Sequence, residues 1–191
     1  NIPGATASTL AIDPVSEGDA GTYDVVVASG CGSLTSSTAT LVTICPADLF
    51  RVNAGGPLVA SGDPGPAWSV DTSGNPSPYV NAGNPVGSTG AAINMSDPSI
   101  PAGTPMSLFQ THRWDLPGGP EMAWNFPTGP GTFQVRLYFA ETFDAINGPN
   151  QRVFDVNIEG QLALDNFDIY AQVGSNKGLV EKLDVTVVDG V

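Results

Sequence analysis

Residues 131–160 read GTFQVRLYFAETFDAINGPNQRVFDVNIEG and contain two runs in which apolar and polar side chains alternate. Every second residue is apolar in 133–139, and the same alternation returns in 153–159. A period of two residues is typical of a strand with one buried face. The loop 141–151 between the runs contains Asn-Gly-Pro at 147–149, residues that favour turns. The pattern therefore predicts a β-hairpin with one face in a core and one face in water.

The composition favours a loop-rich, all-β protein. The 191 residues include 23 glycines and 17 prolines, both above average usage, while charged residues make up only 13%. No long segment shows the 3.6-residue period of an amphipathic helix. We therefore expect strands throughout, with helix confined to short turns.

The charge of the chain excludes some partners. Its formal net charge is −13, from 19 acidic and 6 basic side chains. Such a surface repels phosphate backbones and anionic headgroups, so we expect no nucleic acid partner. No run of about 18 apolar residues exists, so we expect no membrane insertion. A neutral ligand such as a sugar meets no such repulsion.

Outside the opening stretch, further strands are expected at 106–114, 122–126, 162–169 and 180–188. Residues 60–105 contain no convincing strand, because Gly, Pro, Ser and Asn dominate them. A loop-rich stretch of this length in a compact domain is usually functional or held by its neighbours.

Five motifs follow one another along the chain: FRVNAGG at 50–56, LFQTHRW at 108–114, FAETF at 139–143, RVFDVNIEG at 152–160 and LDNFDIYAQVG at 164–174. In this order they resemble the malectin family of carbohydrate-binding domains over residues 48–191. The resemblance implies a jelly-roll-like β-sandwich that binds a glycan without catalysis. The family pattern continues through at least one more strand, so we expect this domain to lack its last strand.

The resemblance also implies a sugar site. Trp114 stands where the family has an aromatic residue after Thr-Glu-Arg, and Phe143 matches the first of two aromatics after Phe-Ala-Glu. Asp144 occupies the second aromatic position and replaces a ring with a carboxylate, while Tyr79 matches only loosely. The acidic residue that completes the family's site would lie beyond Val191.

These residue types suit neutral sugars, because aromatic rings stack on the apolar face of a pyranose and carboxylates accept hydrogen bonds from its hydroxyls. We take an α-linked glucoside as the first candidate ligand, with Tyr79, Trp114, Phe143 and Asp144 as the binding residues. The alternative is structural. Trp114 and Phe143 would then fill the core, and Tyr79 would pack the long loop.

Arg113 and Glu141 are predicted to form an ion pair between two strands, and Asp155 and Asp168 to be structural. Catalysis has little support, because His112 is the sole histidine and no Gly-x-Ser-x-Gly motif is present. We expect no enzyme activity and no cofactor. Calcium in the loop 71–75 is a weak alternative, since its spacing does not match an EF-hand.

Residues 1–44 resemble the last three strands of an immunoglobulin-like domain of bacterial type. Asp-Ala-Gly-Thr-Tyr at 19–23 is similar to the tyrosine corner of that fold, in which the hydroxyl bonds nearby backbone. Residues 45–47 would form a linker to the malectin-like domain. The extended strand between Cys31 and Cys45 would hold these residues too far apart for a disulfide.

These observations predict a carbohydrate-binding module in a secreted or cell-surface, multidomain bacterial protein. The competing hypothesis is a structural or adhesive filament subunit. In that case neighbouring copies of the chain would exchange strands, because an uncovered strand edge accepts another strand.

Overall fold

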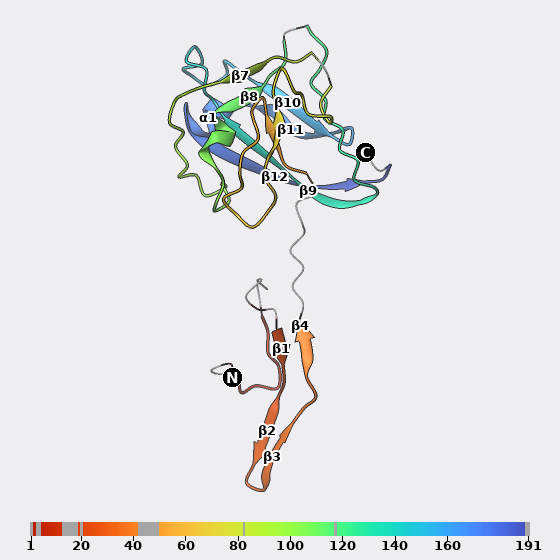
Figure 1. Cartoon of the computed structure of the whole chain (residues 1–191). Helices are drawn as coiled ribbons and strands as arrows, with labels where there is room; N and C mark the ends of the chain where they lie inside the picture. The colour runs from red at the N-terminus through yellow and green to blue at the C-terminus, as the bar shows by residue number, and fades with distance from the viewer. Residues whose placement is uncertain are drawn as a thin grey trace. The chain divides into compact units, whose positions relative to one another are not determined.

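The computed structural model divides the chain into two compact units, Asn1–Ala47 and Asp48–Val191 (Figure 1). The structure describes residues 2, 5–12, 19, 21–41, 50–81, 83–116 and 118–189. The predicted linker 45–47 and Cys45 lie outside the described residues. Among the described residues, no helix is long and apolar enough to cross a bilayer.

The described residues of the first unit form two antiparallel strand pairs. β1 (Gly21–Tyr23) pairs with β4 (Ala39–Leu41), and β2 (Val26–Ser29) forms a hairpin with β3 (Gly32–Thr35). The Tyr23 hydroxyl donates a hydrogen bond to the backbone carbonyl four residues upstream. This is the bond that a tyrosine corner makes. That the unit is immunoglobulin-like stays a prediction.

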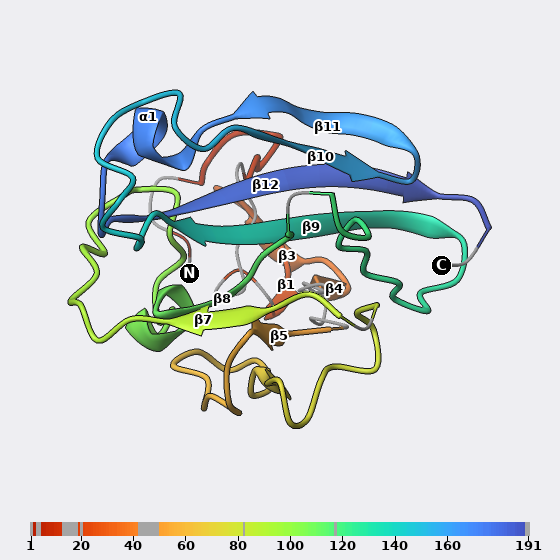
Figure 2. The ribbon, with the colours of Figure 1, turned by 90° about the horizontal axis from the view of Figure 1, so that it is seen from above.

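The centre of the second unit is a ribbon of two long antiparallel strands. β9 (Gly131–Ala140) pairs with β12 (Gly178–Val187) without a register shift. β10 (Phe154–Ile158) pairs instead with β11 (Gln161–Phe167). Figure 2 shows the β10–β11 hairpin running along β12. The predicted hairpin between the two alternating runs is therefore wrong, although both strands exist.

The physical reason is the connection between the strands. Alternation indicates a strand and its buried face, but it does not identify the partner strand. Only a tight turn forces two successive strands to pair. The segment from Glu141 to Val153 is much longer than such a turn, and it leads the chain from the central ribbon to a second layer.

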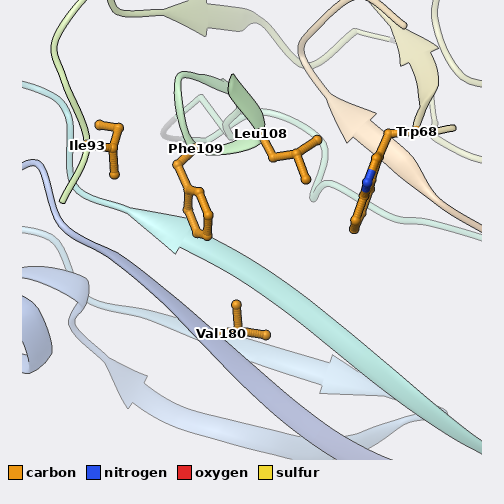
Figure 3. Packing of buried hydrophobic residues seen from close by; sticks show 5 residues of the cluster. All are labelled: Trp68, Ile93, Leu108, Phe109 and Val180. Carbon is orange, nitrogen blue, oxygen red and sulfur yellow. The ribbon is translucent and has the colours of Figure 1, made fainter. Parts of the chain in front are cut away.

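The central ribbon is covered on both faces near its Ala140–Gly178 end. On one face Phe139 and Leu179 pack with Phe167, and the ring centroids of the two phenylalanines are 5.2 Å apart. On the other face Tyr138 and Val180 pack in a cluster with the buried side chains that Figure 3 shows, which are Trp68, Ile93, Leu108 and Phe109. Successive residues of β9 and β12 therefore serve different cores.

Two short strand pairs complete the sheet structure. β5 (Val52–Ala54) runs parallel to β6 (Ser69–Asp71), and β7 (Val86–Ser88) runs antiparallel to β8 (Thr111–Arg113). The expectation that 60–105 lacks strands therefore missed β6 and β7. Each has only three residues, too few for a period of two to stand out.

Three other segments differ from the expected strands. Met106–Phe109 is a 3₁₀ helix, so only the second half of the expected strand 106–114 is extended. In 122–126 the structure has a single β-bridge, between Val80 and Trp124. Ile169–Val173 forms the short helix α1, whose N-cap is Asp168. The Asp168 carboxylate accepts the Ala171 N–H, and this bond lowers the pKa of Asp168.

Candidate functional site

The buried residue Glu141, 1% exposed, fixes the loop that follows β9 through the hydrogen bonds of its carboxylate. Its Oε1 accepts a hydrogen bond from the Phe143 backbone N–H at 2.9 Å. Both carboxylate oxygens lie 2.9 Å from Nη1 of Arg152, which precedes β10. The predicted pair between Arg113 and Glu141 is therefore wrong, because the partner of Glu141 is Arg152.

Arg113 pairs with the fully buried Asp71. Its Nε donates to Asp71 Oδ2 at 2.8 Å and its Nη2 donates to Oδ1. The backbone N–H groups of Gly55 and Ser77 donate to the same carboxylate, each at 2.9 Å. Burial raises the pKa of Asp71, but the bonds from Arg113, Ser77 and Gly55 together outweigh it, so the pKa lies below its ordinary value.

The calcium alternative at 71–75 would involve the carboxylate of Asp71. Both oxygens of that carboxylate already accept hydrogen bonds from the protein. Within the described part of the chain, no group of three or more His, Cys, Asp or Glu side chains could hold a metal ion.

The structure places two predicted binding residues on the loop above Glu141. Phe143 is 57% exposed, and its neighbour Asp144 is also exposed. The guanidinium carbon of Arg152 lies 5.6 Å from the centroid of the Phe143 ring, within the range of a cation–π contact. The loop therefore presents an aromatic ring, a carboxylate and a guanidinium together.

Trp114 follows β8 and is 43% exposed. Its backbone N–H donates to the Pro85 carbonyl at 3.1 Å, which extends the pairing of β7 and β8 by one residue. Side chains two residues apart on an extended chain point to the same side. The Trp114 ring therefore shares the side of β8 on which His112 lies.

The charges of Arg152 and Glu141 act on His112, which lies on that side of β8. Burial lowers the pKa of His112, the charge of Arg152 lowers it further, and the charge of Glu141 opposes both. The imidazole therefore lies within electrostatic range of the Glu141–Arg152 pair. A Cβ atom on Gly87, its cross-strand partner, would lie 2.3 Å from His112 Nε2. A larger residue at position 87 would therefore require the His112 ring to move.

Tyr79 lies in different surroundings. Its ring centroid is 5.1 Å from that of Phe50 and 5.0 Å from that of Phe126. With Phe50 it lines a shallow depression of about 330 Å³ that neither Trp114, Phe143 nor Asp144 lines. The structure therefore brings Phe143 and Asp144 together and gives Tyr79 an aromatic cluster of its own.

Arg152 is the site residue that the sequence reasoning missed. It stands at the start of the RVFDVNIEG motif, which predicts a strand and carries part of the family resemblance but assigns no binding role to its arginine. The available signal is its position: Glu141 directly follows the first alternating run, and Arg152 directly precedes the second run, 153–159, so the two residues flank one loop. Opposite charges at the two ends of one loop are candidates for a pair that closes it.

Comparison with known proteins gives the following matches. Residues 48–191 match the malectin domain. The receptor-like protein kinase FERONIA of Arabidopsis thaliana is 31% identical over 171 residues, which cover 82% of this chain and 18% of the relative. A probable receptor-like protein kinase of the same plant is 31% identical over 152 residues, or 70% and 16% of the two chains. The chain thus spans less than a fifth of these relatives.

Solved structures agree on the fold. The crystal structure of the plant receptor-like kinase FER has a TM-score of 0.57 at 25% identity, covering 74% of this chain and 40% of that one. A β-glucuronidase of Bacteroides uniformis has a TM-score of 0.54 at 17% identity, covering 86% and 19%, and shows the fold alone. The predicted all-β fold with a malectin-like β-sandwich is confirmed.

Proposed function

This chain belongs to the malectin family through residues 48–191, and from that membership we propose that it is a non-catalytic module that binds a neutral glycan. One observation carries the proposal: Trp114 and Phe143 are 43% and 57% exposed. Large aromatic side chains are usually much more buried than this. An exposed ring is a suitable platform for the apolar face of a pyranose.

The local charges favour a neutral ligand over an anionic one. Glu141 contacts Arg152 directly and balances its charge, while Asp144, the residue after Phe143, adds an exposed negative charge. The chain as a whole carries a formal charge of −13, which repels anions at longer range. Asp144 is the residue we assign to accept hydrogen bonds from sugar hydroxyls. An α-linked glucoside is the first candidate because of the family resemblance.

The test is a glycan array, followed by titration of the retained glycan. Trp114→Ala and Phe143→Ala should each weaken binding by about 1.5–3 kcal/mol, the value of burying one large side chain, without lowering the melting temperature. Leu162→Ala is the matched control, because Leu162 is 55% exposed on β11, outside the site. An array without binding, or binding that survives both substitutions, would refute the proposal.

A peptide is the competing ligand class. A solved complex of the plant peptide RALF23 with FER and LLG2 matches this chain with a TM-score of 0.54 at 24% identity. If peptides bind but glycans do not, and Trp114→Ala and Phe143→Ala weaken peptide binding, the proposed binding face is right and the proposed ligand class is wrong.

We further propose a secreted or cell-surface, multidomain bacterial protein, as the resemblance of the first unit to bacterial immunoglobulin-like domains suggests.

A structural role is the second candidate function, and exposure in the first unit favours it. Val26, Val27 and Leu34 of the β2–β3 hairpin are 61%, 65% and 77% exposed. Apolar strands this open invite pairing with another chain, such as a neighbouring copy. Light scattering over a range of concentrations tests this role. A monomer at every concentration would exclude self-assembly by strand exchange.

A further inference from the structure

We propose that Arg152 is a further ligand-contacting residue, which donates two hydrogen bonds to adjacent hydroxyl oxygens of the sugar stacked on Phe143. The inference rests on the proposed function, and it narrows the ligand class to sugars with a free vicinal diol. Two of the guanidinium nitrogens of Arg152 donate no hydrogen bond to the described residues and are available to a ligand.

Glu141 takes one of the three guanidinium nitrogens. Nη1 donates to both of its oxygens, each at 2.9 Å, while Nε and Nη2 of Arg152 donate no hydrogen bond to any described residue. The Arg152 side chain is nevertheless 44% exposed, and the side chain of Glu141 only 1%. The pair is therefore anchored at its buried end and open at its solvent end.

The anchoring gives the open end a defined direction. A guanidinium is planar, so fixing Nη1 against a buried carboxylate restricts where the Nε and Nη2 donors point. The Phe143 ring is tied to the same carboxylate, because its backbone N–H donates to Glu141 and its ring lies under the guanidinium. Glu141 is thus a positioning residue for both groups that would meet the ligand.

The two free donors point the same way and match two neighbouring oxygen acceptors. A vicinal diol and a carboxylate both offer that spacing. The charges decide between them, because the arginine is already neutralised by Glu141 at hydrogen-bonding distance and the exposed Asp144 directly follows Phe143 in the chain. A carboxylate ligand would meet a face with net negative charge, whereas hydroxyl oxygens would not.

The first experiment measures binding of methyl α-glucoside by NMR titration to the wild-type chain and to Arg152→Lys. Lysine keeps the positive charge beside Glu141 but lacks the planar pair of donors. We expect a loss of about ten- to a hundredfold in affinity, as for hydrogen bonds to a charged group, with an unchanged melting temperature. Arg136→Lys, on the exposed face of β9, is the control and should bind like the wild type.

The second experiment uses methyl α-glucosides that lack one hydroxyl each. Two adjacent deoxy positions should weaken binding to the wild type and have little further effect on Arg152→Lys, because the donor pair is already lost. Glu141→Gln should bind the parent glucoside more weakly and discriminate less among the deoxy forms. A purely structural role for either residue would leave that discrimination unchanged.

The outcomes separate this inference from the proposed function. If methyl α-glucoside binds Arg152→Lys as well as it binds the wild type, Arg152 is not a ligand contact and the inference fails alone. If methyl α-glucuronoside binds the wild type more tightly than the glucoside does, the ligand is a carboxylate and the diol assignment fails. If the wild type binds neither sugar and no glycan on the array, the proposed function has failed first.

Discussion

Asp71→Asn should destabilise the second unit more than most single substitutions, because it leaves a buried cation without its counter-charge. Arg113 has a side chain that is 4% exposed, and Asp71 is fully buried. Asparagine has nearly the shape of aspartate, so the packing stays and the negative charge goes. One of the two acceptor oxygens also becomes an NH2 group, which faces N–H donors and cannot accept their hydrogen bonds.

The magnitude follows from the burial. Removing one partner of a buried ion pair costs about 3–5 kcal/mol, because the remaining charge stays in a low dielectric. The two backbone N–H groups of Gly55 and Ser77 also lose a charged acceptor. In a domain of this size each kcal/mol lowers the melting temperature by about 2–4 °C, so we expect a fall of roughly 6–20 °C.

Urea unfolding followed by tryptophan fluorescence measures the free energy of unfolding directly. Asp97→Asn is the matched control. The Asp97–Lys177 pair is 3.5 Å apart with side chains 18% and 30% exposed, and such pairs contribute only about 0–1 kcal/mol. Asp71→Leu combined with Arg113→Met should be less destabilising than Asp71→Asn. If Asp71→Asn costs no more than Asp97→Asn, the reasoning from burial is refuted.

The remaining predictions concern the pH dependence of stability, which His112 and Asp71 should each affect, and a substitution at Gly55. The pKa of His112 is lowered in the folded chain, so as the pH falls the unfolded chain binds a proton there before the folded chain does. The free energy of unfolding should therefore decrease as pH drops below about 6.5. His112→Gln should remove this decrease when urea unfolding is compared at pH 7.5 and 5.5. The pKa of Asp71 is also lowered, so its contribution should be present above about pH 3.9 and be lost below it, a loss that Asp71→Asn should not show. Gly55 has φ +75°, and a Cβ atom there would lie 2.1 Å from the His112 carbonyl oxygen. Gly55→Ala should therefore destabilise the fold by more than the roughly 1–2 kcal/mol that the left-handed conformation alone costs. Gly74→Ala, where a Cβ meets open space, should leave the stability nearly unchanged in the same urea assay.

The sequence could predict the strands whose environment is the same along their length. In 131–137 of β9 the exposure alternates residue by residue, as the apolar pattern requires. The pattern stops at Tyr138, because this residue packs against Trp68 on the face opposite Phe139. A strand covered on both faces has no exposed half, so alternation cannot describe it.

Part of the core was beyond prediction for a related reason. Trp68 and Ile93 are buried, yet both lie in the stretch 60–105, where no period exists. Specific side-chain hydrogen bonds hold that side of the fold. Asn53, 1% exposed, accepts from the Thr111 hydroxyl at 2.7 Å and donates to the Pro57 carbonyl at 2.7 Å. Such bonds depend on residues far apart in the sequence, and no local propensity encodes them.

The difference between the predicted and the observed ion pairs shows why the site, too, could be predicted only in part. The acid and base types were recognisable, but a pair is set by spatial neighbours, and Asp71 and Arg113 are 42 positions apart. The difference matters for function. Because Glu141 pairs with Arg152 and not with Arg113, its buried carboxylate holds the loop that carries Phe143. The same carboxylate therefore stabilises the loop and orients the groups that the loop presents to solvent.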